Sequence, residues 1–481
     1  MSIRNCFTLA LVLLGAQILL SGQTPPTQGT GTDTGNDPSR ATPAPALSGV
    51  MGIDSQMPIE DTSGTLPQIP ALLGGPRLSV ALRSESERSN YLNVGVNVGA
   101  TYDDNALLTP HNTLDNTAVS VFPSISLEQT RSRMSWKLGY ASGLTVNQNL
   151  SNRNQWANDL NLESQFRLSP HVNLRVAEDF SLTSGGFFDS GNSNGVGVGS
   201  GGPNANLLAP LSEQMSSSTV VQTNYHFALN DVLGASGAFY SLHFSNAPAG
   251  VTLTDSRSAS GSAFWLHGFG RDWVGVNYNF QRLTYTPSGQ NSGGETRLHT
   301  ILAINTFNLP NRFTLTAFLG PEYSENQGLV PTGENANATF NAWSYTGGIE
   351  VGWQQNHTSV AAGYSRRISD GSGVLGVVRL QGLHGEMRQQ LRPGWAVGAG
   401  ASYGHNNSVT VPSAGSAERI NSASIGVALE RNLGKSFALR AGYAHDFQEQ
   451  FGTTNTSQQG AAHRNRFSVT LGYQWSRSLG R

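Results

Sequence analysis

One pattern repeats along most of this chain and restricts its fold more than any other feature. Between residues 91 and 477, segments of about 12 to 15 residues place apolar and polar side chains at alternate positions. The first segment sets Val94, Val96 and Val98 against Asn93 and Asn97. Successive side chains of a β-strand point to opposite faces, so this period of two predicts an all-β protein.

The connections between these segments alternate in length. Tight turns are expected at 130–133, 169–170, 230–231, 270–271, 310–311, 355–356, 392–393 and 432–435. Longer polar connections are expected at 104–116, 148–154, 184–213, 246–256, 286–295, 324–338, 369–373, 407–416 and 448–462. Short turns on one side and long loops on the other are typical of outer-membrane barrels. A sandwich of two sheets gives no reason for this alternation.

The sequence therefore predicts a transmembrane antiparallel up-and-down β-barrel of about 18 strands, with 16 as the lower count. An even number of strands brings both termini to the same side, expected to be periplasmic. The strands are expected at 91–103, 117–129, 133–147, 155–168, 171–183, 214–229, 232–245, 257–269, 272–285, 296–308, 311–323, 340–354, 357–368, 374–391, 394–406, 417–431, 435–447 and 463–477. Alternation is irregular in 232–245, 257–269 and 374–391. Glu178 falls on an otherwise apolar face, which indicates a bulge or a different register.

The composition agrees with a β-sheet that separates lipid from water. Charged residues make up only 12% of the chain, and yet the mean hydropathy is −0.27. Low charge with low hydropathy is expected when each strand has one face for lipid and one for water. The formal net charge is −2, and there is no basic stripe of the kind that binds nucleic acid.

Two segments precede the barrel. Residues 1–22 have the pattern of a secretory signal peptide, with Arg4 before a short apolar run and the small residues Ser21 and Gly22 after it. Residues 23–90 are rich in Pro, Thr and Gly and are expected to form a periplasmic linker. Residues 91–481 form the barrel. The single cysteine, Cys6, lies in the leader. These features predict the outer membrane of a Gram-negative bacterium.

Two short motifs resemble those of known outer-membrane proteins. The last segment ends on Trp475, similar to the signal read by the barrel assembly machinery, although six residues follow it. After the first segment, Tyr102-Asp103-Asp104-Asn105 resembles the start of the β-barrel porin 2 family. That resemblance implies an outer-membrane porin-type barrel, sometimes associated with exopolysaccharide.

The expected register also predicts which side chains line a pore. The candidates are Lys137, Asp159, Glu163, Arg167, Arg175, Asp179, Glu350, Arg367, Glu430 and Arg440. Their mixed signs predict weak charge selectivity. The longest connection, 184–213, is expected to narrow the pore with apolar parts that fold into its mouth. Its candidate constriction residues are Phe187, Phe188, Leu207 and Leu208.

Three functions agree with these features. The first is a porin-like channel for passive diffusion of small polar solutes. The others are a barrel linked to exopolysaccharide secretion or assembly, and a non-conducting structural or surface barrel. An enzyme is not expected, because the common hydrolase and metalloprotease motifs are absent from the sequence. No metal or cofactor is expected. The expected partners are outer-membrane lipid and lipopolysaccharide, the barrel assembly machinery, and small solutes or polysaccharide, without nucleic acid.

Overall fold

The computed structural model describes most of the predicted barrel. It covers residues 90–150, 154–184, 212–228, 230–245, 253–287, 293–327, 339–355, 357–371, 373–409, 419–434, 436–451 and 460–479. All of these belong to one unit of the chain, Leu47–Arg481. The predicted signal peptide, the predicted linker up to residue 89, and Phe187, Phe188, Leu207 and Leu208 lie outside the described residues.

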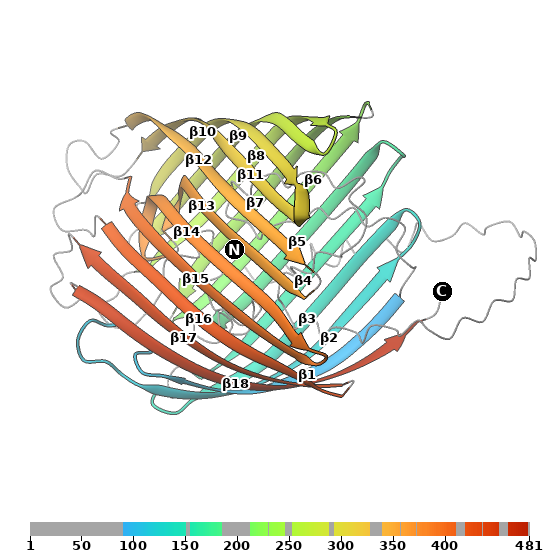
Figure 1. Ribbon diagram of the computed structural model, residues 1–481. Coiled ribbons are helices and arrows are strands. Elements are labelled where there is room, and N and C mark those ends of the chain that lie inside the picture. Colours follow the sequence, from blue (N-terminus) through green and yellow to red (C-terminus); the bar gives the residue numbers. More distant parts are fainter. Residues whose placement is uncertain are drawn as a thin grey trace, which may run out of the picture. The chain divides into compact units, whose positions relative to one another are not determined.

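The described residues form 18 antiparallel strands, which confirms the predicted fold class (Figure 1). The strands are β1 (Asn90–Asp103), β2 (Asn116–Thr130), β3 (Met134–Asn147), β4 (Gln155–Arg167), β5 (Val172–Ser184), β6 (Glu213–His226), β7 (Asp231–Ser245), β8 (Thr254–Phe269), β9 (Asp272–Pro287), β10 (Gly294–Leu309), β11 (Phe313–Gln327), β12 (Thr339–Gln355), β13 (Thr358–Gly371), β14 (Leu375–Arg392), β15 (Trp395–Ser408), β16 (Arg419–Leu433), β17 (Phe437–Phe451) and β18 (Gly460–Ser478).

Each strand pairs with its neighbours in the sequence, and β1 pairs with both β2 and β18, so the sheet closes on itself. Closure leaves no strand edge with unpaired backbone groups. One turn of 3-10 helix, η2 (Pro310–Arg312), joins β10 to β11. Within the part of the chain that the structure describes, no helix is long and apolar enough to cross a membrane.

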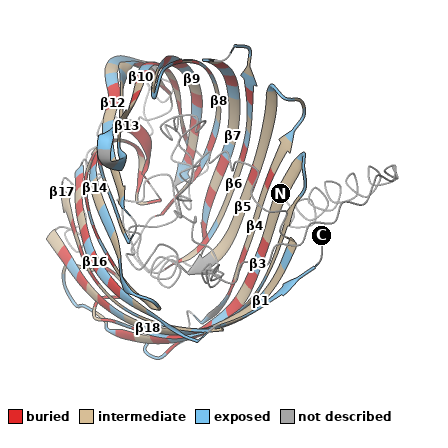
Figure 2. Cartoon of the chain, turned by 45° about the vertical axis from the view of Figure 1, so that its right-hand side comes forward, coloured by how far each residue is buried: buried red, intermediate tan, exposed pale blue. Residues whose placement is uncertain are grey.

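Contacts between strands that are not neighbours identify the inner face of the barrel. Ser256 on β8 donates a hydrogen bond of 2.8 Å to the Asp370 carboxylate on β13, and such distant strands can meet only through the interior. Because paired residues of antiparallel strands share a face, the register carries this assignment around the sheet. Buried and exposed residues alternate along the strands accordingly (Figure 2).

The outer face is apolar on most strands. Exposed examples from widely separated strands are Val98, Ile125, Leu144, Val276, Ile301, Ile349, Val427 and Leu471. Glu178 also lies on this face, because β5 pairs with β4 and β6 without a register shift. Of the two alternatives that the sequence left open, a bulge or a different register, the bulge is absent from β5. The Glu178 carboxylate instead accepts hydrogen bonds from the hydroxyls of Ser217 and Thr219 on β6.

Candidate functional site

The register places all ten predicted pore-lining residues on the inner face. Lys137 lies on β3; Asp159, Glu163 and Arg167 on β4; Arg175 and Asp179 on β5; Glu350 on β12; Arg367 on β13; Glu430 on β16; and Arg440 on β17. They fall into groups on neighbouring strands. Lys137 is paired with Glu163, whose carboxylate lies 2.8 Å from the Arg175 guanidinium, and Glu430 is paired with Arg440.

A hairpin folds into the barrel interior at the end where the connections are long. The end of β13, from Ile368 to Gly371, is buried on both faces, and so are Leu375, Val377 and Val378 on β14. A strand of a single-layer barrel wall normally keeps one face exposed to lipid or solvent. Burial of both faces therefore shows that this hairpin tip lies inside the wall.

The hairpin tip packs against the inner face of β7–β10. Val374 contacts a buried cluster of Tyr240, Leu242 and Phe244 on β7 with Leu253. Ile368 and Val377 pack with Leu283 and Tyr285 on β9 and Leu298 on β10. On its other side, Leu375 and Val378 contact Ile420 on β16. The tip is thus fixed between two regions of the wall and reduces the cross-section of the interior.

Hydrogen bonds add to this packing. Besides the bond between Ser256 and Asp370, the backbone N–H of Thr254 donates to the carbonyl of Gly373 at 2.7 Å. Gly373 has a φ of +83°, and a Cβ at this position would overlap the ring of Phe244. Only glycine accepts this backbone conformation at so close an approach.

The position of the hairpin changes one sequence interpretation. The sequence predicted a loop at 369–373 and gave it no role, whereas the hairpin tip packs inside the wall. Phe244 and Tyr285 lie near the long-connection ends of β7 and β9, where aromatic side chains of outer-membrane barrels commonly face the lipid interface. Both rings are buried on the inner face, where they contact the hairpin.

The connection from β1 to β2 also folds inward. Asp104 accepts two hydrogen bonds of 2.6 Å from Asn465 on β18, one from its backbone and one from its side chain. Asn105 donates to the His463 carbonyl at 2.9 Å, and Leu108 packs on the inward Ala462. Asp104 and Asn105 of the motif Tyr102-Asp103-Asp104-Asn105 therefore bind this connection to β18.

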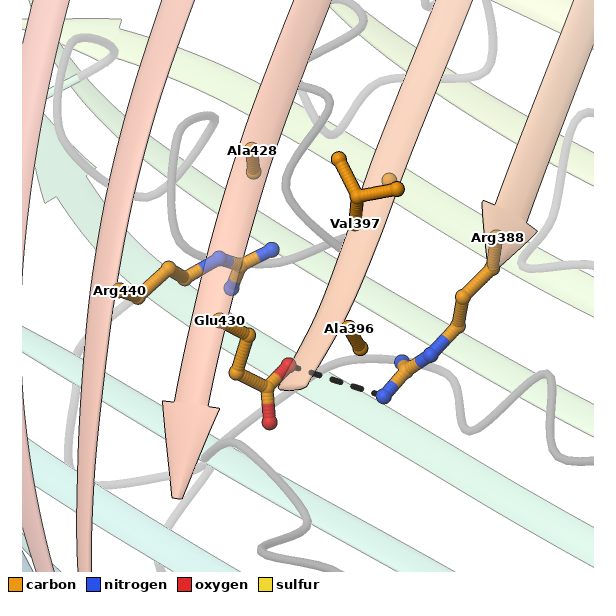
Figure 3. Close-up of a pocket in the computed structure, with 7 residues that line it drawn as sticks. Arg388, Ala396, Val397, Ala428, Glu430 and Arg440 are labelled. Carbon is orange, nitrogen blue, oxygen red and sulfur yellow. Dashed lines mark ion pairs between the residues drawn. The ribbon is translucent and has the colours of Figure 1, made fainter. Parts of the chain in front are cut away.

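Two groups, each made of one acidic residue and two arginines, differ in the exposure of their side chains. In the closed triad, Asp446 lies 2.9 Å from Arg464 and 3.0 Å from Arg466, and all three side chains are at most 3% exposed. In the open triad, Arg388 lies 3.6 Å from Glu430, with 36% and 27% of these side chains exposed. Arg440 completes the open triad beside Glu430 (Figure 3).

Arg388 was missed by the sequence analysis. Its strand has irregular alternation because one end belongs to the hairpin tip, which is buried on both faces. The pairing of Arg388 with Gly398 on β15 places it on the inner face. One sequence feature could have identified it: Arg388 lies two residues after Glu386, so the two charged side chains share one face of that strand.

Comparisons with known proteins give a likeness of architecture only. No family model and no curated protein matches the chain, so the resemblance to the β-barrel porin 2 family stays a prediction. Among solved structures, Acinetobacter baumannii OccAB1 is similar at 11% identity and a TM-score of 0.41, over 82% of this chain and 99% of that one. Pseudomonas aeruginosa OpdK with vanillate gives 11% and 0.40, over 81% and 99%.

The ferric-catecholate import receptor Fiu from E. coli K12 is similar at 8% identity and a TM-score of 0.42, over 81% of this chain and 82% of that one. At these values the likeness carries no functional inference. Function is therefore inferred below from this chain's own residues.

Proposed function

We propose that this chain is an outer-membrane channel through which small polar solutes diffuse passively. The observation that carries the proposal is the charged inner face of a closed 18-stranded barrel, formed by β1–β5, β11–β14 and β16–β18. Several of these side chains remain accessible from the interior, among them Glu163 at 41% exposure. Barrels of 16 to 18 strands are wide enough to enclose an aqueous channel.

The outer face supports a membrane location. Its exposed apolar side chains extend over most of the strands, and so large an apolar surface requires lipid around it. The long connections lie at one end of the barrel, together with the short turn of the inward hairpin between β13 and β14, and the other short turns lie at the opposite end, as in outer-membrane barrels. By that rule those short turns, the start of β1 and the end of β18 face the periplasm. Lipid and lipopolysaccharide, and the assembly machinery, are the partners such a location implies.

The inward hairpin limits what can pass. Its tip is held against β7–β10 by apolar packing and by the hydrogen bond of Ser256 to Asp370, so it acts as a fixed constriction. The charged groups on the remaining wall have both signs, which favours weak charge selectivity. A role in transport, without catalysis or a cofactor, accounts for these features together.

Conductance in planar lipid bilayers tests the proposal. The purified chain should give stable steps of uniform size, and deletion of the hairpin tip, residues 369–376, should enlarge them. A barrel that is folded, as judged by heat-modifiable gel mobility, but silent in the bilayer would contradict the channel. The remaining alternatives would then be a barrel linked to secretion and a structural barrel. Equal steps before and after the deletion would contradict the hairpin as the constriction.

A further inference from the structure

We propose that His445 and His463 form a binding site for a divalent transition-metal ion on the outer face of the barrel, near the long connections. His445 lies on β17 and His463 on β18. Antiparallel pairing sets His445 opposite Asn465. His463, two residues before Asn465 on β18, shares its face. This is the outer face, which also carries the exposed ring of Phe467. The site is separate from the lumen and goes beyond the proposed channel function.

The two imidazoles are spaced as two ligands of one metal ion are. Their ring centres lie 5.8 Å apart, and the ring planes are inclined by 32°. Two imidazoles that bind one ion through nitrogens at about 2.0 to 2.1 Å have ring centres roughly 5 to 6 Å apart. An ion between His445 and His463 therefore requires side-chain rotation at most, without movement of either strand.

The hydrogen bonds leave ring nitrogens available for the ion. Nδ1 of His445 lies 2.8 Å from Oδ1 of Asn465. Since an amide oxygen only accepts hydrogen bonds, Nδ1 carries the proton of the neutral ring, and Nε2 keeps its lone pair. Among the described residues, neither Nε2 of His445 nor the ring nitrogens of His463 have a hydrogen-bond partner. The His463 ring packs on Phe447, with ring centres 5.1 Å apart.

Asn465 also holds His445 in place. The side-chain N–H of Asn465 donates to the Asp104 carboxylate at 2.6 Å. Because a carboxylate accepts only from a donor, this contact identifies the nitrogen end of the amide and leaves its oxygen facing His445. The same oxygen accepts a hydrogen bond of 2.8 Å from the Tyr443 hydroxyl. Histidines that bind metals commonly have such an acceptor behind the non-ligating nitrogen, since it fixes the tautomer and the ring orientation.

His405 on β15 provides the contrast. The register carries the outer face across β16 to this residue. Its Nδ1 lies 2.6 Å from Oδ1 of Asn421, and its Nε2 lies 3.1 Å from Nδ2 of Asn407. Both ring nitrogens are therefore engaged, and neither is left for a metal ion. His445 and His463 differ from His405 in this respect, although all three lie on one face.

The protein supplies two ligands to this site. Within the part of the chain that the structure describes, no three His, Cys, Asp or Glu side chains are grouped closely enough to hold a metal ion, so water completes the coordination. Imidazole nitrogens suit Zn²⁺, Ni²⁺ and Cu²⁺, and affinity is highest for Cu²⁺. His463 is exposed, so an ion can reach the pair from outside the barrel. Cu²⁺ is therefore the probe of choice.

Equilibrium dialysis of the detergent-solubilised full chain against Cu²⁺, without a histidine tag, tests the site. The tightest bound ion should show two nitrogen ligands in its EPR spectrum. His445→Ala and His463→Ala should each weaken its binding at least tenfold, because one protein ligand remains. Asn465→Leu should weaken it about tenfold, through loss of the acceptor behind a ligating histidine. His405→Ala is the matched control and should leave binding unchanged.

The two histidines must act together for the proposal to hold. Heat-modifiable gel mobility shows that each variant is folded. Unchanged binding in folded His445→Ala or His463→Ala would overturn the site, and so would an equal loss in His405→Ala or an EPR spectrum of a single nitrogen ligand. The channel is judged separately: a conducting chain that fails these tests contradicts the metal site alone, and a silent chain that passes them contradicts the channel alone.

Discussion

The inner faces of β6–β10 and of the other strands differ in charge. The described residues of β6–β10 place no Asp, Glu, Lys or Arg on the inner face. The other strands carry all ten predicted pore-lining charges, together with Asp103, Arg388, Asp446 and Arg464. We call these regions the neutral wall and the charged arc.

The difference follows from what covers each region. The hairpin tip lies on the neutral wall, where an unpaired charge would lose its hydration without compensation. Much of the charged arc remains accessible from the interior, so its charges need no close partner. Where the arc is covered, the charges have close polar partners: Asp446 is paired with two arginines, and the Glu322 carboxylate accepts hydrogen bonds from the hydroxyls of Ser344 and Thr346. Whether other parts of the barrel cover a region of the inner face therefore determines which side chains its strands can place there.

The largest expected effect comes from the covered part of the charged arc. Asp446→Asn would remove the carboxylate that lies within 3.0 Å of the buried Arg464 and Arg466, which should cost about 3 to 5 kcal/mol of stability. Urea unfolding of the micelle-bound barrel, followed by tryptophan fluorescence, measures this loss. A change below about 1 kcal/mol, typical of an exposed ion pair, would show that water reaches this triad.

On the neutral wall, stability should depend on packing instead. Leu298 is 1% exposed beneath Ile368 and Val377 of the hairpin, so Leu298→Ala should cost about 2 to 5 kcal/mol through lost burial and the cavity it leaves. The same unfolding experiment applies. Leu319→Ala on the outer face of β11, where Leu319 is 61% exposed, is the control. Equal losses in the two variants would argue against a docked hairpin.

The fold was predictable from the sequence because the same two signals repeat many times. Period-two alternation and the alternating lengths of connections gave 18 strands, with boundaries close to those of the structure. Each segment alone is a weak signal. Agreement across all segments fixes the register, and the register alone assigns residues such as Glu430 and Arg440 to the inner face.

The hairpin was not predictable from that pattern, because the pattern assumes one lipid-facing side for each strand. At the hairpin tip both faces are covered by protein, and beneath it the hairpin covers the inner face while the outer face is the apolar exterior, so apolar residues appear on both faces. In β9, Tyr278 and Phe280 face outward, while Leu283 and Tyr285 face inward. Irregular alternation in 232–245 and 374–391 therefore marked interior contacts. Which strands meet there depends on tertiary packing that spacing does not encode.

The contact of the hairpin with the neutral wall can be tested where Gly373 lies against Phe244. Gly373→Ala should cost about 1 to 3 kcal/mol through the left-handed backbone conformation, and the added methyl group would overlap the Phe244 ring. We expect the tip to separate from the wall and the conductance step to enlarge. Phe244→Ala in the same chain should remove the overlap but not the backbone strain. Full recovery in that double variant would show that the backbone conformation contributes nothing.

The smallest expected effect on stability lies in the open part of the charged arc. Glu163→Gln removes a partner of Arg175 in a half-buried pair, in which the Glu163 side chain is 41% exposed and the Arg175 side chain 12%, so the loss should be about 1 kcal/mol, the upper end of the range for exposed pairs. The lumen would gain one net positive charge, and the reversal potential in a KCl gradient should shift toward anion preference. Gln165→Ala, on the same face of β4, is the uncharged control. If Glu163→Gln instead cost several kcal/mol and left the reversal potential unchanged, the charges of the arc would stabilise the wall and would not act on solutes.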